Sequence, residues 1–283
     1  MNIERLYGSA TSETSSAVRR VTIHDLANAK LTGEHWPMLT AYDAITANIF
    51  DTAGIPVLLV GDSASMVVHG NDSTLPITVD EMIPLVRAVV RGTSRALIVA
   101  DLPFGSYQES PGQALSTAVR FMKETGCHAV KLEGGVAMVD HVEKIVSAGI
   151  PVMGHIGLTP QSVHNLGGYK VQGKTLDAKE KLFADAKALE YAGAFSIVIE
   201  CVPNSLTEEL VQQTTVPLIG IGAGNATDGQ VMVWQDLLGL TSGRTAKFVK
   251  KYSDLNTIIN DSVTRWANDV SVGAFPDKEH SYN

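Results

Sequence analysis

The chain contains few of the residues that mark several large protein classes. Among 283 residues there are two cysteines, Cys127 and Cys201, and they do not form a Cys-x-x-Cys pair. Neither a disulfide framework nor a zinc site is therefore expected, and two reduced, buried thiols are typical of a cytoplasmic protein. No apolar run approaches the roughly 18 residues that a membrane-spanning helix needs.

Positive charge is also scarce. The 22 Lys and Arg residues are outnumbered by 30 Asp and Glu residues, which leaves a formal net charge of −8. This composition argues against nucleic acid or an anionic membrane as the main partner, because both require clustered basic side chains. It does not argue against a small acidic substrate, whose binding depends on the local charge of its site.

The first twenty residues lack the apolar core of a secretory signal and are rich in Ser and Thr. We expect residues 1–20 to form a flexible N-terminal extension. We expect residues 21–283 to form a single catalytic domain, since nothing that looks like a low-complexity linker or an internal repeat interrupts them.

The rest of the chain alternates between short apolar runs and amphipathic segments. The apolar runs are nearly continuous, which is typical of parallel strands buried on both faces. Helices are expected between them, at 43–54, 78–92, 112–126 and 177–193, and again in the tail beyond Ala246. The candidate strands are 37–43, 55–62, 96–101, 128–133, 150–155, 195–200, 216–222 and, weakly, 237–240.

Strands that alternate with helices predict a parallel α/β fold. Eight candidate strands in a chain of this length favour a closed (β/α)8 TIM barrel over an open, doubly wound sheet. No Gly-x-Gly-x-x-Gly follows the first strand, so the dinucleotide-binding form of the open sheet is disfavoured. A short helix at 22–30 is expected to cover the lower end of the barrel as an N-terminal capping helix.

Four of the apolar runs end in acidic residues: Asp62, Asp101, Glu133 and Glu200. A single carboxylate after a strand usually caps the next helix or begins a turn. In a barrel, however, all strands end at the face where active sites form. The alternation therefore predicts that these four carboxylates converge.

Converging carboxylates raise one another's pKa values unless a cation neutralises them. Oxygen ligands favour Mg²⁺, Mn²⁺ or Ca²⁺, and Mg²⁺ typically leaves coordination positions for substrate oxygens. A 2-oxo acid could chelate such an ion, which would stabilise the enolate formed when the neighbouring carbon loses a proton. The base for that proton must lie away from the metal, and Glu200, on a more distant strand, suits this role.

Other residues carry weaker hypotheses. Lys131 lies on the same strand face as Glu133 and could hold a substrate carboxylate, or simply pair with an acid. His155 could be a second-shell donor or a core histidine, and Ser63 a substrate ligand or a helix cap. The glycine-rich stretch 220–229 resembles a phosphate-binding loop, and 164–175 could cover a pocket or be a surface insertion.

Together these motifs resemble those of the ketopantoate hydroxymethyltransferase family. The resemblance runs from about Val21 to the motif EHSY near the end of the chain. The motifs that carry it are LTAYD, VGDS, DSTLPIT, ADLPFGSY, VKLEGG, GHIGLTPQSV, GGYKVQG, ECVP and GIGAGNATDGQ.

The resemblance implies a Mg²⁺-dependent transferase with a (β/α)8 barrel. It would transfer a hydroxymethyl group from 5,10-methylenetetrahydrofolate to 3-methyl-2-oxobutanoate, giving 2-dehydropantoate in pantothenate (coenzyme A precursor) synthesis. By the family pattern, Glu200 accepts the proton, and Asp62, Asp101 and Glu133 bind the metal, the last directly or through water. The oxo acid is bound by Asp62, Ser63, Asp101 and Lys131. Family members are large cytoplasmic homo-oligomers, commonly decamers.

Other functions remain open from the residues alone. A metal-dependent carbon–carbon lyase acting on a 2-oxo acid would use the same metal and enolate chemistry in reverse. A sugar-phosphate isomerase or synthase would use the glycine-rich loop. A silent metal-binding or organic-acid-binding protein would need neither Glu200 nor Lys131, and both are present.

Overall fold

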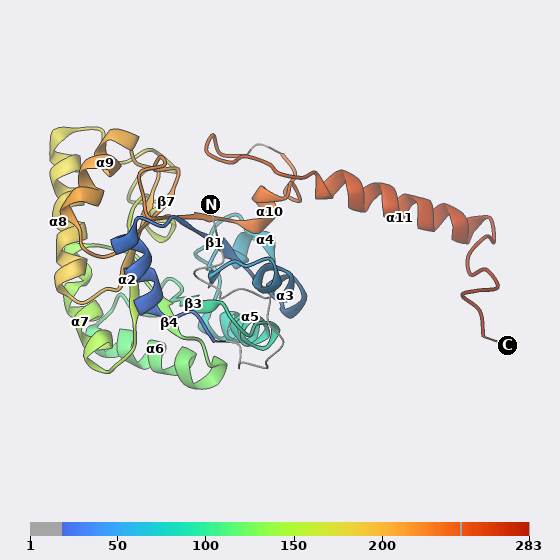
Figure 1. The fold of residues 1–283 in the computed structure, drawn as a ribbon, viewed down its shortest axis with the longest axis horizontal. Coiled ribbons are helices and arrows are strands. Elements are labelled where there is room, and N and C mark those ends of the chain that lie inside the picture. The colour runs from blue at the N-terminus through green and yellow to red at the C-terminus, as the bar shows by residue number, and fades with distance from the viewer. Residues whose placement is uncertain (1–18, 244, 283) are drawn as a thin grey trace. The chain divides into compact units, whose positions relative to one another are not determined.

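The computed structural model describes residues 19–243 and 245–282 and contains a closed barrel of eight parallel strands (Figure 1). Each strand pairs with the next one in the sequence, and β8 closes the barrel against β1. The predicted (β/α)8 barrel is confirmed, and the open sheet is excluded. The strands are β1 (Trp36–Thr40), β2 (Val57–Val60), β3 (Leu97–Asp101), β4 (Ala129–Lys131), β5 (Val152–Gly157), β6 (Ser196–Glu200), β7 (Leu218–Ile221) and β8 (Gly229–Met232).

Helical segments follow each of the first six strands and surround the barrel (Figure 1). The four helices predicted between strands are confirmed as α3, α5, α6 and α8, within a few residues at each end. The α7 and α9 helices and the short helical turns were not predicted. The segments are α3 (Ala44–Thr52), α4 (Ala64–Val67), α5 (Val79–Gly92), α6 (Pro111–Thr125), η1 (Val136–Met138), α7 (Val139–Ser147), η2 (Pro160–Ser162), α8 (Leu176–Tyr191) and α9 (Asn204–Gln213).

The ends of the predicted helices follow from local hydrogen bonding. Thr78 caps α5: its side chain accepts the Glu81 N–H, and the Glu81 carboxylate accepts the Thr78 N–H. This reciprocal capping box satisfies donors that the first turn leaves free. At the C-terminal end of α6, Gly126 takes a left-handed conformation with φ of 77°. Glycine adopts this conformation without strain and so stops the helix.

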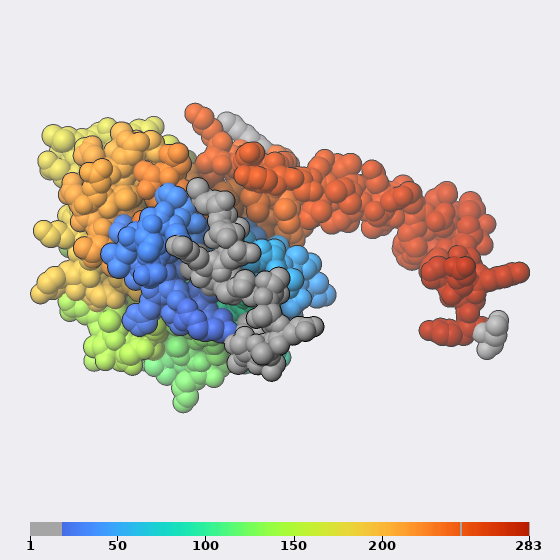
Figure 2. All heavy atoms as spheres, viewed as in Figure 1, coloured from blue at the N-terminus to red at the C-terminus, as the bar shows by residue number. Residues whose placement is uncertain are grey.

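A separate helix, α2 (Ile23–Thr32), closes the lower end of the barrel as predicted. Its Leu26 and Ala29 are buried in one cluster with Trp36 and with residues that begin or line the strands. A buried Leu in such a cluster contributes about 2 kcal/mol. In Figure 2 the dark blue atoms of this segment form part of the surface that faces the viewer.

The eighth strand lies elsewhere than predicted. The sequence analysis placed it at 237–240, but Leu237 ends the short helix α10 (Trp234–Leu237) and the strand is Gly229–Met232. Its first residue packs closely, because a Cβ on Gly229 would lie 3.1 Å from the Trp36 ring. A strand that begins Gly-Gln lacks the apolar run by which the others were recognised.

The glycine-rich stretch 220–229 also differs from expectation. It connects β7 to β8, and within the described residues no helix begins in it. A phosphate-binding loop depends on the N–H groups at the start of a helix. The stretch lacks that feature, and phosphate binding by it stays a prediction.

The chain divides into two compact units, and the second begins at Trp234. All eight strands belong to the first unit. The second contains α10 and α11 (Leu255–Ser271), which confirms the predicted helix in the tail. The predicted division into 1–20 and 21–283 stays a prediction, and residues 1–18 of the expected extension lie outside the described residues. Within the described chain, no helix is long and apolar enough to cross a membrane.

Candidate active site

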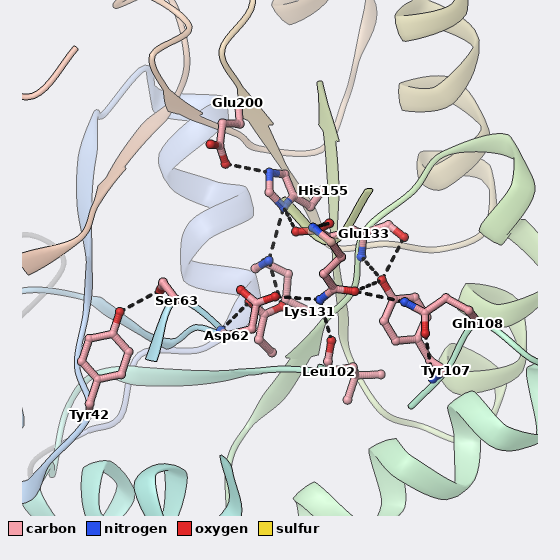
Figure 3. Close-up of polar contacts among 12 residues, drawn as sticks. Tyr42, Asp62, Ser63, Leu102, Tyr107, Gln108, Lys131, Glu133, His155 and Glu200 are labelled. Carbon is pink, nitrogen blue, oxygen red and sulfur yellow. Dashed lines mark hydrogen bonds and ion pairs between the residues drawn. The ribbon is translucent and has the colours of Figure 1, made fainter. Parts of the chain in front are cut away.

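The predicted acidic residues meet at the end of the barrel where the strands finish (Figure 3). Asp62 follows β2, Asp101 ends β3, and Glu200 ends β6. Lys131 ends β4, and Glu133 follows two residues later. Sequence positions up to 138 residues apart thus form one site because every strand of the barrel runs in the same direction.

Asp101 and Lys131 form a buried ion pair at the centre of the site. They are direct partners in the register of β3 and β4, and Lys131 Nζ lies 2.8 Å from Asp101 Oδ1. Burial alone would lower the pKa of Lys131, but Asp101, Glu133 and Asp62 outweigh that effect and raise it. Lys131 is therefore a permanent cation at neutral pH, and its pairing with Asp101 was one of the two alternatives left open by the sequence.

Asp62 is the carboxylate least compensated by positive charge. Its backbone N–H donates to Asp101 Oδ2 at 3.2 Å, which holds the two residues side by side. Burial raises the pKa of Asp62 well above its usual value, and the charges of Asp101 and Glu133 raise it further. The charged form of Asp62 is therefore disfavoured unless a cation binds beside it.

His155, on β5, links the remaining two carboxylates (Figure 3). Its Nδ1 lies 3.3 Å from Glu133 Oε1, and its Nε2 lies 3.2 Å from Glu200 Oε2. Burial and the nearby Lys131 would lower the pKa of His155, but the contacts with Glu133 and Glu200 raise it to about 9. The imidazolium form therefore dominates at neutral pH, so His155 holds the two carboxylates rather than accepting a proton.

Gln161, on η2, connects three of the loops and was not singled out from the sequence. Its Nε2 donates to Asp62 Oδ2 at 2.9 Å and to the Leu102 carbonyl at 3.0 Å. Its Oε1 accepts from Tyr107 Oη at 2.7 Å, and its backbone N–H donates to Glu133 Oε2 at 2.9 Å. The signal was available, because Gln161 lies in the quoted motif GHIGLTPQSV and Tyr107 in ADLPFGSY.

Ser63 lies at the edge of the site beside a second residue that the sequence analysis passed over, Tyr42 (Figure 3). The Tyr42 and Ser63 hydroxyls are 2.8 Å apart. Ser63 precedes α4, but its side chain makes no capping hydrogen bond there. Its hydroxyl is therefore oriented by Tyr42 rather than used as a helix cap.

A small cavity of about 70 Å³ lies over these residues. This volume accommodates only a few water-sized groups. Its wall contains both polar and apolar side chains, a combination suited to a small branched acid. The polar residues are Thr40, Asp62, Ser63, Asp101, Lys131, Glu133 and His155, and the apolar ones include Val198, Ile221, Val231 and Met232.

The chemistry of the site fits a hard divalent cation at Asp62 and Asp101. Mg²⁺ is typically held by one or two carboxylates, with water and substrate completing its shell. Glu133 is less available, because its oxygens face His155 and the Gln161 N–H. Among the described residues no group of three or more His, Cys, Asp or Glu side chains is arranged to hold an ion alone. A two-carboxylate site completed by water and substrate agrees with that finding.

Comparison with known proteins settles the family. The sequence model of the family described as ketopantoate hydroxymethyltransferase matches residues 20–278 of this chain. The chain belongs to the ketopantoate hydroxymethyltransferase family. This confirms the resemblance read from the sequence motifs.

Curated relatives cover nearly the whole chain. A 3-methyl-2-oxobutanoate hydroxymethyltransferase of Thermobifida fusca is 64% identical over 94% of this chain and 95% of its own length. One of Frankia casuarinae is 57% identical over 98% of this chain and 93% of its own. One of Mycobacterium sp. (strain KMS) is 55% identical over the full length of both.

Solved structures share the fold of this ketopantoate hydroxymethyltransferase family member at low identity. A phosphonopyruvate hydrolase complex with oxalate and Mg²⁺ has a TM-score of 0.59 and 12% identity, covering 91% of this chain and 92% of its own. A 2,3-dimethylmalate lyase of the PEP mutase/isocitrate lyase superfamily has a TM-score of 0.58 and 16% identity, covering 92% of this chain and 91% of its own. At these identities the likeness establishes the barrel fold alone.

Proposed function

We propose that this protein transfers a hydroxymethyl group from 5,10-methylenetetrahydrofolate to the C3 atom of 3-methyl-2-oxobutanoate, giving 2-dehydropantoate for pantothenate synthesis. The observation that carries the proposal is the position of His155, which lies between two groups of side chains in the site. Asp62, Asp101 and Lys131 lie on one side of this residue, and Glu200 lies on the other. The relatives described above, whose printed name is that of this activity, support the same assignment.

The oxo acid would bind in the small cavity with its oxygens toward Asp62, Asp101 and Lys131. The ammonium of Lys131 suits the substrate carboxylate, and the hydroxyl of Ser63 can donate to the same group. The branched carbon end then faces the apolar wall formed by Val198 and Val231. Mg²⁺ bound at Asp62 and Asp101 would act as a Lewis acid that lowers the energy of the enolate.

Glu200 would remove the proton from C3. It ends β6, and its side chain keeps 15% of its surface exposed, against 3% for Glu133. His155 is less suited to be the base, because its contacts with Glu133 and Glu200 raise its pKa and favour its charged form. The contact of His155 with Glu200 orients the Glu200 carboxylate and partly offsets its negative charge.

Water adds to the methylene carbon of the donor and both carbon–nitrogen bonds break, so that tetrahydrofolate leaves with a proton on each nitrogen and the one-carbon unit is released as formaldehyde. The enolate carbon attacks this carbonyl carbon and forms the new carbon–carbon bond, and the proton that Glu200 took from C3 passes to the resulting alkoxide to give the hydroxyl group. Lys131 and the imidazolium of His155 keep the surrounding negative charge balanced through these steps.

The base can be tested with a half-reaction that needs no donor. Wild-type protein with Mg²⁺ and 3-methyl-2-oxobutanoate in D₂O should incorporate deuterium at C3, as followed by ¹H NMR. Glu200→Gln should slow this exchange roughly 10²- to 10⁴-fold, which is the usual contribution of a general base. A matched control is Glu180→Gln, which changes an exposed glutamate on α8.

Two outcomes would contradict the proposal at different points. Exchange at the wild-type rate in Glu200→Gln would exclude Glu200 as the base. Exchange in the wild type without 2-dehydropantoate formation, when tetrahydrofolate and formaldehyde are added, would exclude the transfer. The second result would favour the alternative, a metal-dependent carbon–carbon lyase acting on a 2-oxo acid.

We also propose that the protein is a cytoplasmic homo-oligomer, a decamer by family resemblance, and that its other partners are small molecules. The exposed apolar side chains of α11, including Val263 and Trp266, agree with an assembled form.

A further inference from the structure

A second and much larger cavity lies beside the site. Its volume is about 630 Å³, within the usual range for small-molecule sites. Glu133 lines both this cavity and the small one over Asp62 and Asp101. The two spaces therefore adjoin at one carboxylate of the site. The large cavity is bounded by the loops after β3, β4 and β5 and by the start of α8, including Phe104, Gly135, Gln161, Gln172 and Ala178.

The unequal sizes of the two cavities indicate which substrate of the proposed reaction each cavity binds. The small cavity has room for a compact acid and no more. The one-carbon donor carries a fused bicyclic ring and an aromatic arm, and it must bring its methylene carbon next to the acid. The large cavity offers both the volume and the shared wall that this approach requires.

The lining of the large cavity suits a flat ring with N–H groups. Phe104, half-exposed, provides an aromatic face. Asp185 provides a buried carboxylate: its Oδ1 accepts the Val136 N–H at 2.9 Å, and its Oδ2 contacts Lys181. Because the Lys181 side chain is 73% exposed, it can turn to solvent when N–H groups of a ligand take its place on Oδ2 of the buried Asp185. A carboxylate oxygen freed in this way can accept the adjacent N–H groups of an aminopyrimidinone ring.

We infer that this cavity, between the β4 and β5 loops and α8, binds the reduced-folate donor of the one-carbon unit. The inference rests on the proposed transferase function and adds the place where the second substrate binds. It also explains the segment 164–175, left open as a pocket cover or a surface insertion. Residues Asn165, Leu166, Gln172 and Gly173 of that segment line the cavity.

The test fills the cavity without touching the oxo-acid site. Ala178, in the first turn of α8, lines the cavity, and its contact with Thr175 uses only its backbone N–H. Ala178→Trp should weaken tetrahydrofolate binding, measured by isothermal titration calorimetry, by at least about tenfold. Deuterium exchange at C3 of 3-methyl-2-oxobutanoate should stay within about twofold of the wild-type rate, because that half-reaction uses the small cavity.

The matched control is Ala184→Trp, which adds the same side chain at an exposed position of the same helix outside the cavity lining. It should bind tetrahydrofolate as the wild type does. Equal binding by both tryptophan variants would overturn the cavity assignment, whatever reaction the wild type catalyses. Absence of exchange and transfer in the wild type would instead refute the proposed function, so the two failures are distinguishable.

Discussion

At the scale of single residues, the site depends on the fixed orientation of one amide. Gln161 donates from Nε2 to Asp62 and to the Leu102 carbonyl, and it accepts at Oε1 from Tyr107 and Gln108. If the amide were turned over, its nitrogen would face the donors of Tyr107 and Gln108, and its oxygen would face the acceptors of Asp62 and Leu102. Gln161 therefore acts as a positioning residue that holds the Asp62 carboxylate in place.

Replacing this amide should weaken metal binding. Gln161→Met keeps the length of the side chain but leaves Asp62 Oδ2 without its donor. Residues that orient metal ligands usually contribute 10- to 100-fold to affinity, so the Mg²⁺ concentration for half-maximal C3 exchange should rise roughly 10- to 100-fold. Gln212→Met, at an exposed position of α9, is the control. An unchanged Mg²⁺ requirement in a folded Gln161→Met variant would show that Gln161 does not position Asp62 for metal binding.

At the scale of elements, helix ends could be read from the sequence more easily than the contacts that join neighbouring elements. Asp51 shows the limit: it lies near the end of α3, and its carboxylate accepts backbone N–H groups of residues 94–96, just before β3. An acceptor 43 to 45 residues away from its donors has no local signal. The capping box of Thr78 and Glu81, by contrast, is contained within four consecutive positions.

His128, directly before β4, should make stability depend on pH. Its Nδ1 accepts the Ile98 N–H at 3.0 Å, so the folded protein needs the neutral ring. Burial lowers the pKa of His128 to about 4, and Arg20 adds to the effect. Between this value and the ordinary histidine pKa of about 6.5, the unfolded chain binds a proton that the folded chain does not. Stability should therefore be complete above pH 6.5 and fall as the pH drops toward 4.

Urea unfolding at pH 7.5 and pH 5 checks this expectation. His128→Gln should lose less stability between the two pH values than the wild type, by about 1–2 kcal/mol. His69→Gln, at an exposed position, should behave like the wild type. Equal losses in all three proteins would mean that His128 does not control the pH dependence.

At the scale of the whole molecule, barrel closure determines which residues meet. Lys131 pairs with Asp101 because β4 lies beside β3, and Glu200 lies level with Gly157 because β6 lies beside β5. The two halves of the site are joined by His155 on the intervening strand. This order of strands gives the proposed base, Glu200, and the proposed metal ligands their separate positions.

The assembly can be tested on the whole protein. The α11 helix has no buried residue, and its exposed apolar side chains include Ile258, Val263 and Trp266. Analytical ultracentrifugation should give a mass several times that of the 30.2 kDa chain. A decamer corresponds to about 300 kDa. A mass equal to that of one chain over a wide concentration range would contradict the proposed oligomer.

The sequence by itself determined the strand–helix alternation, the barrel, the family and the four acidic strand ends. These properties could be read because each depends on residues that are neighbours in the chain or recur with a short period. It did not locate β8, because a strand of sequence Gly-Gln-Val-Met lacks the continuous apolar run by which the other strands were recognised.

Only the tertiary structure decided how the acidic residues are used. Their burial, the pairing of Lys131 with Asp101 and the bridging position of His155 all join residues on different strands. The place of Gln161 among Asp62, Leu102 and Tyr107 likewise depends on three loops meeting above the barrel. Such contacts have no local pattern, because electrostatic and hydrogen-bond partners are chosen by distance in space.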